Sequence, residues 1–333
     1  MIRIALDAMG SDNYPTPDVI GGVLAAREYG VEVILVGDKE KIEPVLKQQE
    51  LGSGVVRIMH APEMLGMHDK GEALVFKARH KDSKNSMAVG MDMVKNGEAD
   101  AFVTAGNTGA AWVTALFRLG RLRGVSKPAL AVIFPTAKGH CVVLDIGANP
   151  DCEPENLVQF AKMGSIYAEK VRGVANPRVG IISNGEEEGK GNLLVRETSI
   201  LLKQADLNFV GNIEGKEMIG GHVDVAVTDG FTGNVVLKTS EAIAKFIMDS
   251  MKTSILNGNI MVKLGGMLIK PALKKLKNLM DPSEEGAAPL LGVNGLVFIG
   301  HGRSDDQAIK NAVRIAKEAV ESNVLESIKE KIH

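Results

Sequence analysis

Residues 226–237 read AVTDGFTGNVVL, a short apolar stretch followed by a polar, glycine-containing loop and a second apolar stretch. Residues 102–112 read FVTAGNTGAAW and repeat this order. Glycine permits a tight backbone turn, and Asn, Asp and Thr favour the start of a helix. We therefore interpret both stretches as junctions at which a buried strand ends and a helix begins.

The same alternation extends along the rest of the chain, where short, β-branched apolar runs are separated by stretches with helical periodicity. Such runs are typical of strands covered on both faces, and their alternation with helices favours a mainly parallel sheet. The sequence therefore predicts an α/β fold with helices on both faces of the sheet, formed by residues 1–333 as a single domain. The predicted strands are residues 2–6, 33–36, 55–59, 101–104, 129–133, 142–145, 179–182, 208–210, 223–227 and 297–299, and the predicted helices include residues 17–29, 156–170, 193–204 and 305–322.

Composition excludes several classes of protein. The chain has 333 residues, of which 45% are hydrophobic and 24% charged, as in an ordinary soluble enzyme. A net charge of −2 gives no basic field for nucleic acid, so no nucleic-acid partner is expected. Two cysteines cannot form a disulfide framework, and the N-terminus begins directly with an apolar strand without a signal-peptide pattern. A cytoplasmic setting is therefore predicted.

Polar, glycine-rich loops follow five of the predicted strands. If the strands are parallel, all five loops converge on one edge of the sheet, where free N–H groups at helix starts can bind an anion such as phosphate. Each single loop also fits a tight turn with a helix cap, and Thr108 or Thr232 could be such a cap. Neither a dinucleotide-binding nor a P-loop pattern occurs, so no cofactor is predicted, and no metal is predicted because no metal-ligand spacing is present. The five loops are ALDAMGSD, VTAGNTGA, VLDIGANPD, IISNGEEEGKGN and VTDGFTGN.

Seven motifs carry a family resemblance: ALDAMGSD, FVTAGNTGA, LDIGANPDCEPENLVQFA, ISNGEEEGKGN, VGNIEGKE, VTDGFTGNVVLKT and HGRSD. Their order and spacing resemble the PlsX-type phosphate acyltransferases over essentially the whole chain. The resemblance implies acyl transfer from acyl carrier protein to inorganic phosphate, which gives acyl phosphate for phospholipid synthesis. It also implies a fold related to phosphotransacetylases and isocitrate/isopropylmalate dehydrogenases, a homodimer, and a downstream membrane-bound glycerol-3-phosphate acyltransferase. Ser11 and Asn13 depart from the Gly and His that members commonly carry there.

The reaction fits the loop residues. Phosphate can attack a thioester directly if the enzyme holds it and stabilises the oxyanion. Backbone N–H groups of the two Thr-Gly loops suit these tasks, and Lys190 is the predicted cation for phosphate, although a surface lysine at a helix start is an equal alternative. The acids at positions 186–188 are expected to face solvent or helix N–H groups. The predicted substrate-binding residues are Asp7, Gly106, Asn107, Thr108, Gly109, Asn192, Thr232, Gly233 and Asn234, and the predicted catalytic residues are Lys190, Asn184, Asp229 and His301.

Individual roles remain open at several of these positions. Asp7 and Asp229 end strands, where a structural role in fixing loop N–H groups is at least as well supported as acid–base work. His301 can protonate a leaving thiolate, although a thiolate leaves without such help. Neither cysteine is a predicted nucleophile, because Cys141 lies in an apolar strand and Cys152 lies between two acids. Direct transfer of the acyl group in a ternary complex is therefore expected.

Residues 250–280 contain six lysines and no acid, so this segment carries +6 and the rest of the chain −8. Met, Leu and Ile recur among the lysines at near-helical intervals, with interruptions at Gly265-Gly266 and at Pro271. We predict two amphipathic helices that form a protruding hairpin within residues 250–285. The hairpin could form a dimer interface, lie on an anionic membrane or receive acyl carrier protein.

Two further functions are alternatives to the acyltransferase. One is a phosphotransacetylase that acts on short acyl-CoA. The other is a non-catalytic, membrane-associated binding protein of lipid metabolism that keeps the acyl or phosphate pocket.

Overall fold

The structure is a computed structural model that describes residues 1–67, 69, 71–80, 82–279 and 282–332. Within these residues eleven strands form one sheet in the order β3-β2-β1-β4-β11-β10-β5-β6-β9-β7-β8. The strands are β1 Arg3–Asp7, β2 Glu32–Gly37, β3 Val55–His60, β4 Ala101–Thr104, β5 Ala129–Thr136, β6 Gly139–Leu144, β7 Arg178–Ile182, β8 Asn208–Ile213, β9 Val225–Val227, β10 Ala287–Leu291 and β11 Val297–Gly300. All ten predicted strands are present with small shifts at their ends, and β10 is additional.

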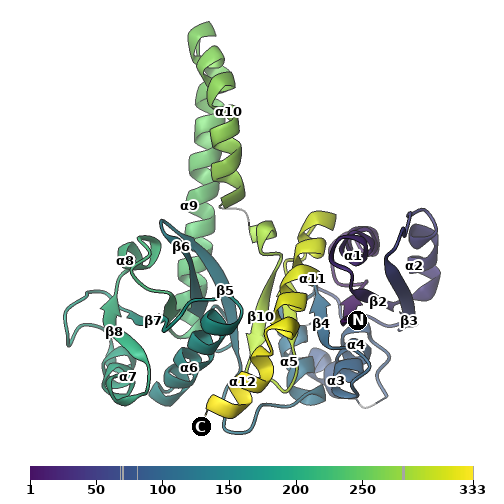
Figure 1. Cartoon of the computed structure of the whole chain (residues 1–333), viewed down its shortest axis with the longest axis horizontal. Helices are drawn as coiled ribbons and strands as arrows, with labels where there is room; N and C mark the ends of the chain where they lie inside the picture. The colour runs from purple at the N-terminus through teal and green to yellow at the C-terminus, as the bar shows by residue number, and fades with distance from the viewer. Residues whose placement is uncertain (68, 70, 81, 280–281, 333) are drawn as a thin grey trace.

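Helices cover both faces of the sheet, as predicted (Figure 1). They are α1 Thr16–Tyr29, α2 Lys39–Leu46, α3 Gly71–Arg79, α4 Ser86–Lys95, α5 Thr108–Arg118, α6 Pro154–Lys170, α7 Leu193–Gln204, α8 Gly215–Ile219, α9 Gly230–Asn257, α10 Ile260–Leu279, α11 Asp306–Glu321 and α12 Val324–Lys331, with a 3-10 turn η1 at Pro282–Glu284. Neighbouring strand residues alternate between two hydrophobic cores, so that Ile4 and Ala5 of β1 lie on opposite faces. The helices α5 and α9 both pack on the face that contains Ala5.

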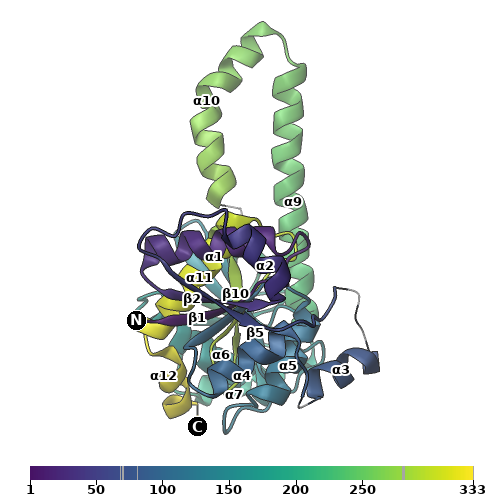
Figure 2. The same ribbon diagram turned by 90° about the vertical axis from the view of Figure 1, so that its right-hand side faces the viewer.

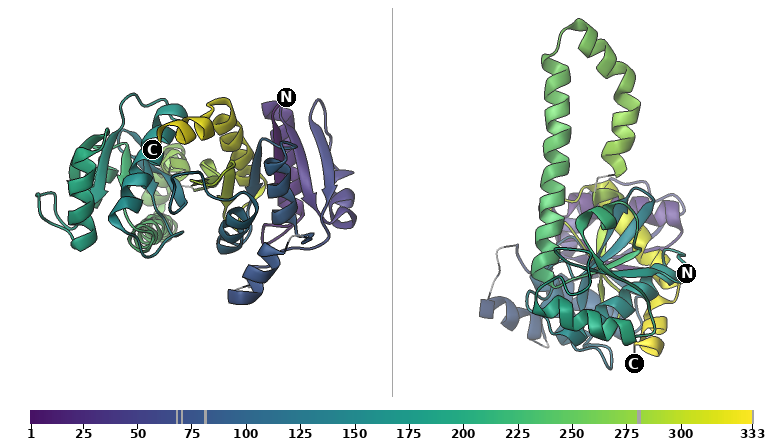
Figure 3. Two further views of the ribbon diagram at one scale, coloured as in Figure 1. Left: turned by 90° about the horizontal axis from the view of Figure 1, so that it is seen from below. Right: turned by 90° about the vertical axis from the view of Figure 1, so that its left-hand side faces the viewer.

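Strand direction reverses in the middle of the sheet. β10 is antiparallel to both β11 and β5, and β5 is antiparallel to β6. Three successive antiparallel pairs make β1, β4 and β11 run opposite to β6, β9 and β7. Figure 3 (left) shows the N-terminal strands and the second set of strands at opposite ends of the body, with the C-terminal helices between them.

This reversal corrects the expectation that all five loops end at one edge of the sheet. The loops after β1 and β4 form one group at one edge, whereas the loops after β6, β7 and β9 form a second group at the opposite edge. The error arises from β10, which periodicity did not reveal because Pro289 cannot donate a ladder hydrogen bond and is rarely found inside a central strand.

The basic segment forms the predicted helical hairpin, which protrudes from the body (Figures 1 and 2). Its boundaries differ from the prediction, because α9 begins at Gly230 and α10 continues through Gly265, Gly266 and Pro271. Gly266 permits close approach of the two helices, since an added Cβ would lie 2.4 Å from Cγ2 of Ile255. Residues 280 and 281 of the predicted segment lie outside the described residues. Among the described helices, none combines the length and apolar character required to cross a bilayer.

Candidate active site

The first loop group lies at the ends of β1, β4 and β11. Thr104 pairs with Ile299 in neighbouring parallel strands, so residues 105–109 and 301–304 leave the sheet side by side. The backbone N–H of Asp12 donates to the Gly302 carbonyl at 2.7 Å and connects the β1 loop to the same group. Of the predicted site residues, this group brings together Asp7, Gly106, Asn107, Thr108, Gly109 and His301.

Asp7, at the end of β1, holds the β1 and β4 loops through hydrogen bonds to its buried carboxylate. Its carboxylate accepts hydrogen bonds from the Thr104 hydroxyl at 2.7 Å and from the Met9 backbone N–H at 3.0 Å. The side chain is buried, and burial raises the pKa of Asp7 above its usual value while the hydrogen bonds oppose this shift. Both carboxylate oxygens are used inside the protein, so the structural role is the one that the contacts support.

The N-terminus of α5 is open to an anion. Asn107 caps this helix, because its side-chain oxygen accepts the Ala110 N–H at 3.0 Å, and its amide nitrogen donates to backbone carbonyls of the β3 loop, including that of Met67 at 3.1 Å. Thr108 and Gly109 occupy the first two helical positions, where backbone N–H groups have no partner inside the helix. Both residues are exposed. These donors and the helix dipole together suit a phosphate.

His301 lies close to Glu241, a residue of α9. Its Nε2 lies 3.8 Å from Oε1 of Glu241 on α9, and the second carboxylate oxygen of Glu241 accepts from the Lys238 ammonium at 3.0 Å. Partial burial lowers the pKa of His301, and the charges of Lys238 and Arg303 lower it further, whereas Glu241 acts in the opposite direction. His301 is therefore mostly neutral at pH 7 and able to accept a proton.

The second loop group forms the start of α9. Asp229 caps the helix and accepts both the N–H and the hydroxyl of Thr232 at 2.8 Å. Gly233 is required by packing, because an added Cβ would lie 1.9 Å from the Asp145 carbonyl oxygen. The side chain of Asn234 is exposed beside Gly147. The cap engages the third N–H of the helix, as Asn107 does at α5, but here the first N–H, that of Gly230, also donates to the Asn149 carbonyl at 2.8 Å.

Asn184, Lys190 and Asn192 lie together in the loop after β7, which neighbours β9. The Asn184 side-chain oxygen accepts the Gly191 N–H at 2.9 Å, and the Asn192 oxygen caps α7 by accepting the Val195 N–H at 2.9 Å. Of the adjacent acids, Glu188 pairs with Lys203, and Glu186 pairs with Lys216 at 2.6 Å. The Lys216 ammonium occupies the carboxylate cluster formed by Glu186, Glu214 and Glu217.

Lys190 keeps a free charge within the described residues, because its exposed ammonium has no ion-pair partner there. We expect Lys190→Ala to lower kcat/KM by roughly tenfold, since a charge-assisted contact contributes about 1.5–3 kcal/mol. The melting temperature should not change. Lys203→Ala, which removes a neighbouring lysine that pairs with Glu188, is the matched control. An increase in the KM for phosphate, with kcat unchanged, would support the predicted phosphate contact. Unchanged kinetics would make Lys190 a surface charge.

Both cysteines have environments that disfavour a thiolate. Cys141 is buried in β6, and burial raises the pKa of its thiol. Burial, together with Asp145, raises the pKa of Cys152 to about 11. We expect the double replacement of Cys141 and Cys152 by Ala to keep most of the activity, with some loss of stability from the buried site. An acyl-enzyme trapped during turnover, or ping-pong kinetics, would contradict direct transfer.

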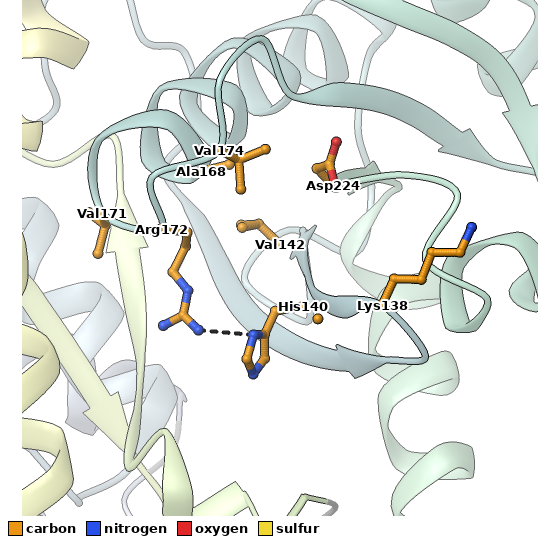
Figure 4. Close-up of a pocket in the computed structure, with 9 residues that line it drawn as sticks. Lys138, His140, Val142, Ala168, Val171, Arg172, Val174 and Asp224 are labelled. Carbon is orange, nitrogen blue, oxygen red and sulfur yellow. Dashed lines mark hydrogen bonds between the residues drawn. The ribbon is translucent and has the colours of Figure 1, made fainter.

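A pocket of about 330 Å³ lies outside both loop groups, between the start of β6 and the end of α6 (Figure 4). Two of its charged side chains, Arg172 and Asp224, already have protein partners. Arg172 lies 3.2 Å from Nδ1 of His140 and 3.3 Å from Glu285, and Asp224 binds Arg178 at 2.9 Å. We assign no reaction step to this pocket. It is lined by Lys138, Gly139, His140, Val142, Ala168, Val171, Arg172, Val174 and Asp224.

Sequence reasoning missed three residues around His301. Arg303 follows it in the HGRSD motif, is exposed and has no ion-pair partner within the described residues, so its position in the motif was an available signal. Lys238 stands near the end of the VTDGFTGNVVLKT motif and Glu241 lies just beyond it, about sixty residues before His301 in the sequence. Only the fold brings them to the end of β11.

The family model described as "Fatty acid synthesis protein" matches residues 2–327. A phosphate acyltransferase from Pelotomaculum thermopropionicum is 47% identical over 331 residues, which cover 99% of this chain and 95% of the relative. A phosphate acyltransferase from Geobacter sulfurreducens is 46% identical, covering 99% of this chain and 94% of the relative.

Among solved structures, a phosphotransacetylase from Streptococcus pyogenes superposes with a TM-score of 0.62 at 16% identity, covering 96% of this chain and 94% of that chain. The EutD phosphotransacetylase from Staphylococcus aureus gives a TM-score of 0.61 at 15% identity, covering 95% of this chain and 94% of that chain. The fold is therefore that of the phosphotransacetylases, as predicted. The chain belongs to the fatty acid synthesis protein family, which confirms the resemblance seen in its motifs.

Proposed function

We propose that this enzyme transfers a fatty acyl group from acyl carrier protein to inorganic phosphate and supplies acyl phosphate for phospholipid synthesis. The observation that carries the acyl transfer to phosphate is the 47% identity, over 99% of the chain, to a curated phosphate acyltransferase. Acyl carrier protein is proposed as the acyl donor from the resemblance of the motifs to the phosphate acyltransferases.

The geometry supports a phosphate site at the N-terminus of α5. Exposed Thr108 and Gly109 offer backbone N–H groups, and Arg303 supplies a cation from the neighbouring loop. Bound phosphate attacks the thioester carbonyl, the carbonyl oxygen becomes an oxyanion, and the C–S bond then breaks to release the thiol. The loop after β7, with Lys190 and the side-chain amides of Asn184 and Asn192, forms a second set of donors for an anionic group.

A phosphotransacetylase that uses short acyl-CoA is the alternative that the fold favours, because the solved neighbours bear that name. Steady-state kinetics with a long-chain acyl carrier protein, the matching acyl-CoA and acetyl-CoA decide between the donors. We expect the acyl carrier protein thioester to give a kcat/KM at least about tenfold above either CoA thioester, since the carrier's own surface adds binding energy that is used in the transition state. A preference for acetyl-CoA would support the alternative.

The hairpin is proposed as a peripheral membrane contact. Many of its apolar side chains are exposed, including Leu268 at 83% and Ile260 at 74%. Lysines such as Lys263, Lys270 and Lys274 lie exposed among them. Apolar burial and lysine attraction together favour an anionic lipid surface. Such contact would place acyl phosphate near a membrane-bound glycerol-3-phosphate acyltransferase. The same apolar surface also suits a homodimer, and size-exclusion chromatography beside a vesicle-binding assay separates the two roles.

A further inference from the structure

Glu241 holds an unusual position on α9. It lies eleven residues after the helix start, about 16 Å along the axis, where α9 has crossed the sheet to the end of β11. Its Oε2 accepts from Lys238, but its buried Oε1 has no hydrogen-bond partner within the described residues. The nearest imidazole nitrogen, Nε2 of His301, lies 3.8 Å from Oε1. A buried carboxylate oxygen without a partner is costly, and catalytic hydrogen bonds are often long before substrate binds.

The reaction requires one proton to move. The phosphate dianion HPO₄²⁻ carries one proton, the acyl phosphate dianion carries none, and the released thiolate gains one to become a thiol. A group beside the phosphate must therefore accept this proton as the P–O oxygen bonds to the carbonyl carbon, and return it to sulfur as the C–S bond breaks. Neutral His301, on the loop beside the N-terminus of α5, is a suitable carrier.

The charges around His301 oppose the protonated state that this transfer creates. Lys238 on α9 and Arg303 on the same loop both disfavour an imidazolium, and Glu241 is the carboxylate that favours it. Without Glu241 the imidazolium would face two cations. The acid therefore supplies the counter-charge at the moment when His301 holds the proton.

We infer that Glu241 is the positioning residue of the acyl transfer: it orients the imidazole of His301 and stabilises its protonated form while the proton passes from phosphate to sulfur. This role rests on the proposed function. Glu241 itself touches neither substrate in this account, and it acts only through His301.

The test measures kcat and both KM values from pH 5.5 to 9 in the parent enzyme, Glu241→Gln, His301→Gln and the double variant. We expect His301→Gln to lower kcat by about a hundredfold and Glu241→Gln by about tenfold, with little change in the KM for phosphate. Since neutral His301 starts the reaction, activity falls as pH drops through its pKa. Removing the Glu241 charge lowers the pKa of His301, and the acid limb of the plot of kcat against pH therefore moves to lower pH. In the His301→Gln background, Glu241→Gln should have no further effect.

Asp249→Asn is the matched control, because Asp249 is an acid on the same helix that pairs with Lys245 at 2.9 Å and lies two turns beyond Glu241. It should leave kcat and the acid limb unchanged. Additive losses in the double variant, or an acid limb that stays in place in Glu241→Gln, would overturn the inference and leave Glu241 as a helix-surface partner of Lys238.

A readout independent of activity separates this inference from the proposed function. NMR titration of ¹⁵N-labelled histidine, with His301 assigned through His301→Gln, should give a lower pKa for His301 in Glu241→Gln than in the parent enzyme. An unchanged His301 pKa would refute the coupling even in an active enzyme. A parent enzyme that forms no acyl phosphate, yet shows the shift, would refute the proposed function while the contact between the two side chains stands.

Discussion

Gly109→Asp is expected to raise the KM for phosphate on the order of a hundredfold while the melting temperature stays at or above that of the parent enzyme. An added Cβ at this position meets only Oδ1 of Asn107, at 3.4 Å, so the side chain fits. A carboxylate in the first turn of α5 suits the helix dipole and replaces a glycine, which favours stability. The same carboxylate competes for the open N–H groups and repels the phosphate dianion, and hydrogen bonds to a charged group contribute about 1.5–3 kcal/mol each.

Gly109→Asn is the matched control, because it has nearly the same size without the charge. We expect it to raise the KM for phosphate by less than about tenfold, since it obstructs the site but does not repel the anion. Measuring the KM for the acyl donor in both variants shows whether the effect is specific to phosphate. An unchanged KM for phosphate in Gly109→Asp would place the phosphate away from α5, and the Lys190 loop would become the remaining candidate.

Charge reversal on the hairpin is expected to release the enzyme from anionic vesicles. Lys263, Lys270 and Lys274 are exposed on α10, and each lysine near an anionic surface contributes about 1 kcal/mol. Replacing all three by Glu should therefore weaken vesicle binding by on the order of a hundredfold, and high salt should have a similar effect on the parent enzyme. Polar replacement of Leu268 and Ile269 should weaken binding even at low salt, because apolar burial is not screened.

Replacement by Glu of three lysines that are exposed on the α/β body, Lys47, Lys95 and Lys203, is the control for net charge. It should leave most vesicle binding intact. Acyl transfer in solution should survive the hairpin replacements, because α10 contributes no residue to either loop group. Size-exclusion chromatography must accompany the vesicle assay. A hairpin variant that dissociates to monomers while it still binds vesicles would show that the segment is a dimer interface instead.

The strands were predictable because each is a short apolar run bounded by polar loops. Their directions were not. The sequence pattern of a parallel strand does not differ from that of a central antiparallel strand, and Pro289 concealed the strand whose pairing reverses the sheet. The grouping of the loops at two opposite edges therefore required the structure.

The candidate site was also predictable only in part. The motifs revealed both helix starts, but not which of their donors are already engaged. Both caps accept the third N–H of their helix, but at α9 the first N–H, that of Gly230, donates to the Asn149 carbonyl, whereas at α5 the N–H groups of Thr108 and Gly109 stay open within the described residues. The contact of Glu241 with His301 joins residues sixty positions apart, and no periodicity or motif relates them. Only the path of α9 across the sheet brings them together.

The formation of acyl phosphate tests most directly whether the chain transfers an acyl group from a thioester to inorganic phosphate. Purified enzyme is incubated with a long-chain acyl carrier protein with and without phosphate, and the product is followed by ³¹P NMR and trapped with hydroxylamine. We expect one acyl phosphate and one free thiol per thioester consumed, with product formation saturating in phosphate. Thioester consumption that does not depend on phosphate, or no acyl phosphate at any phosphate concentration, would contradict the account.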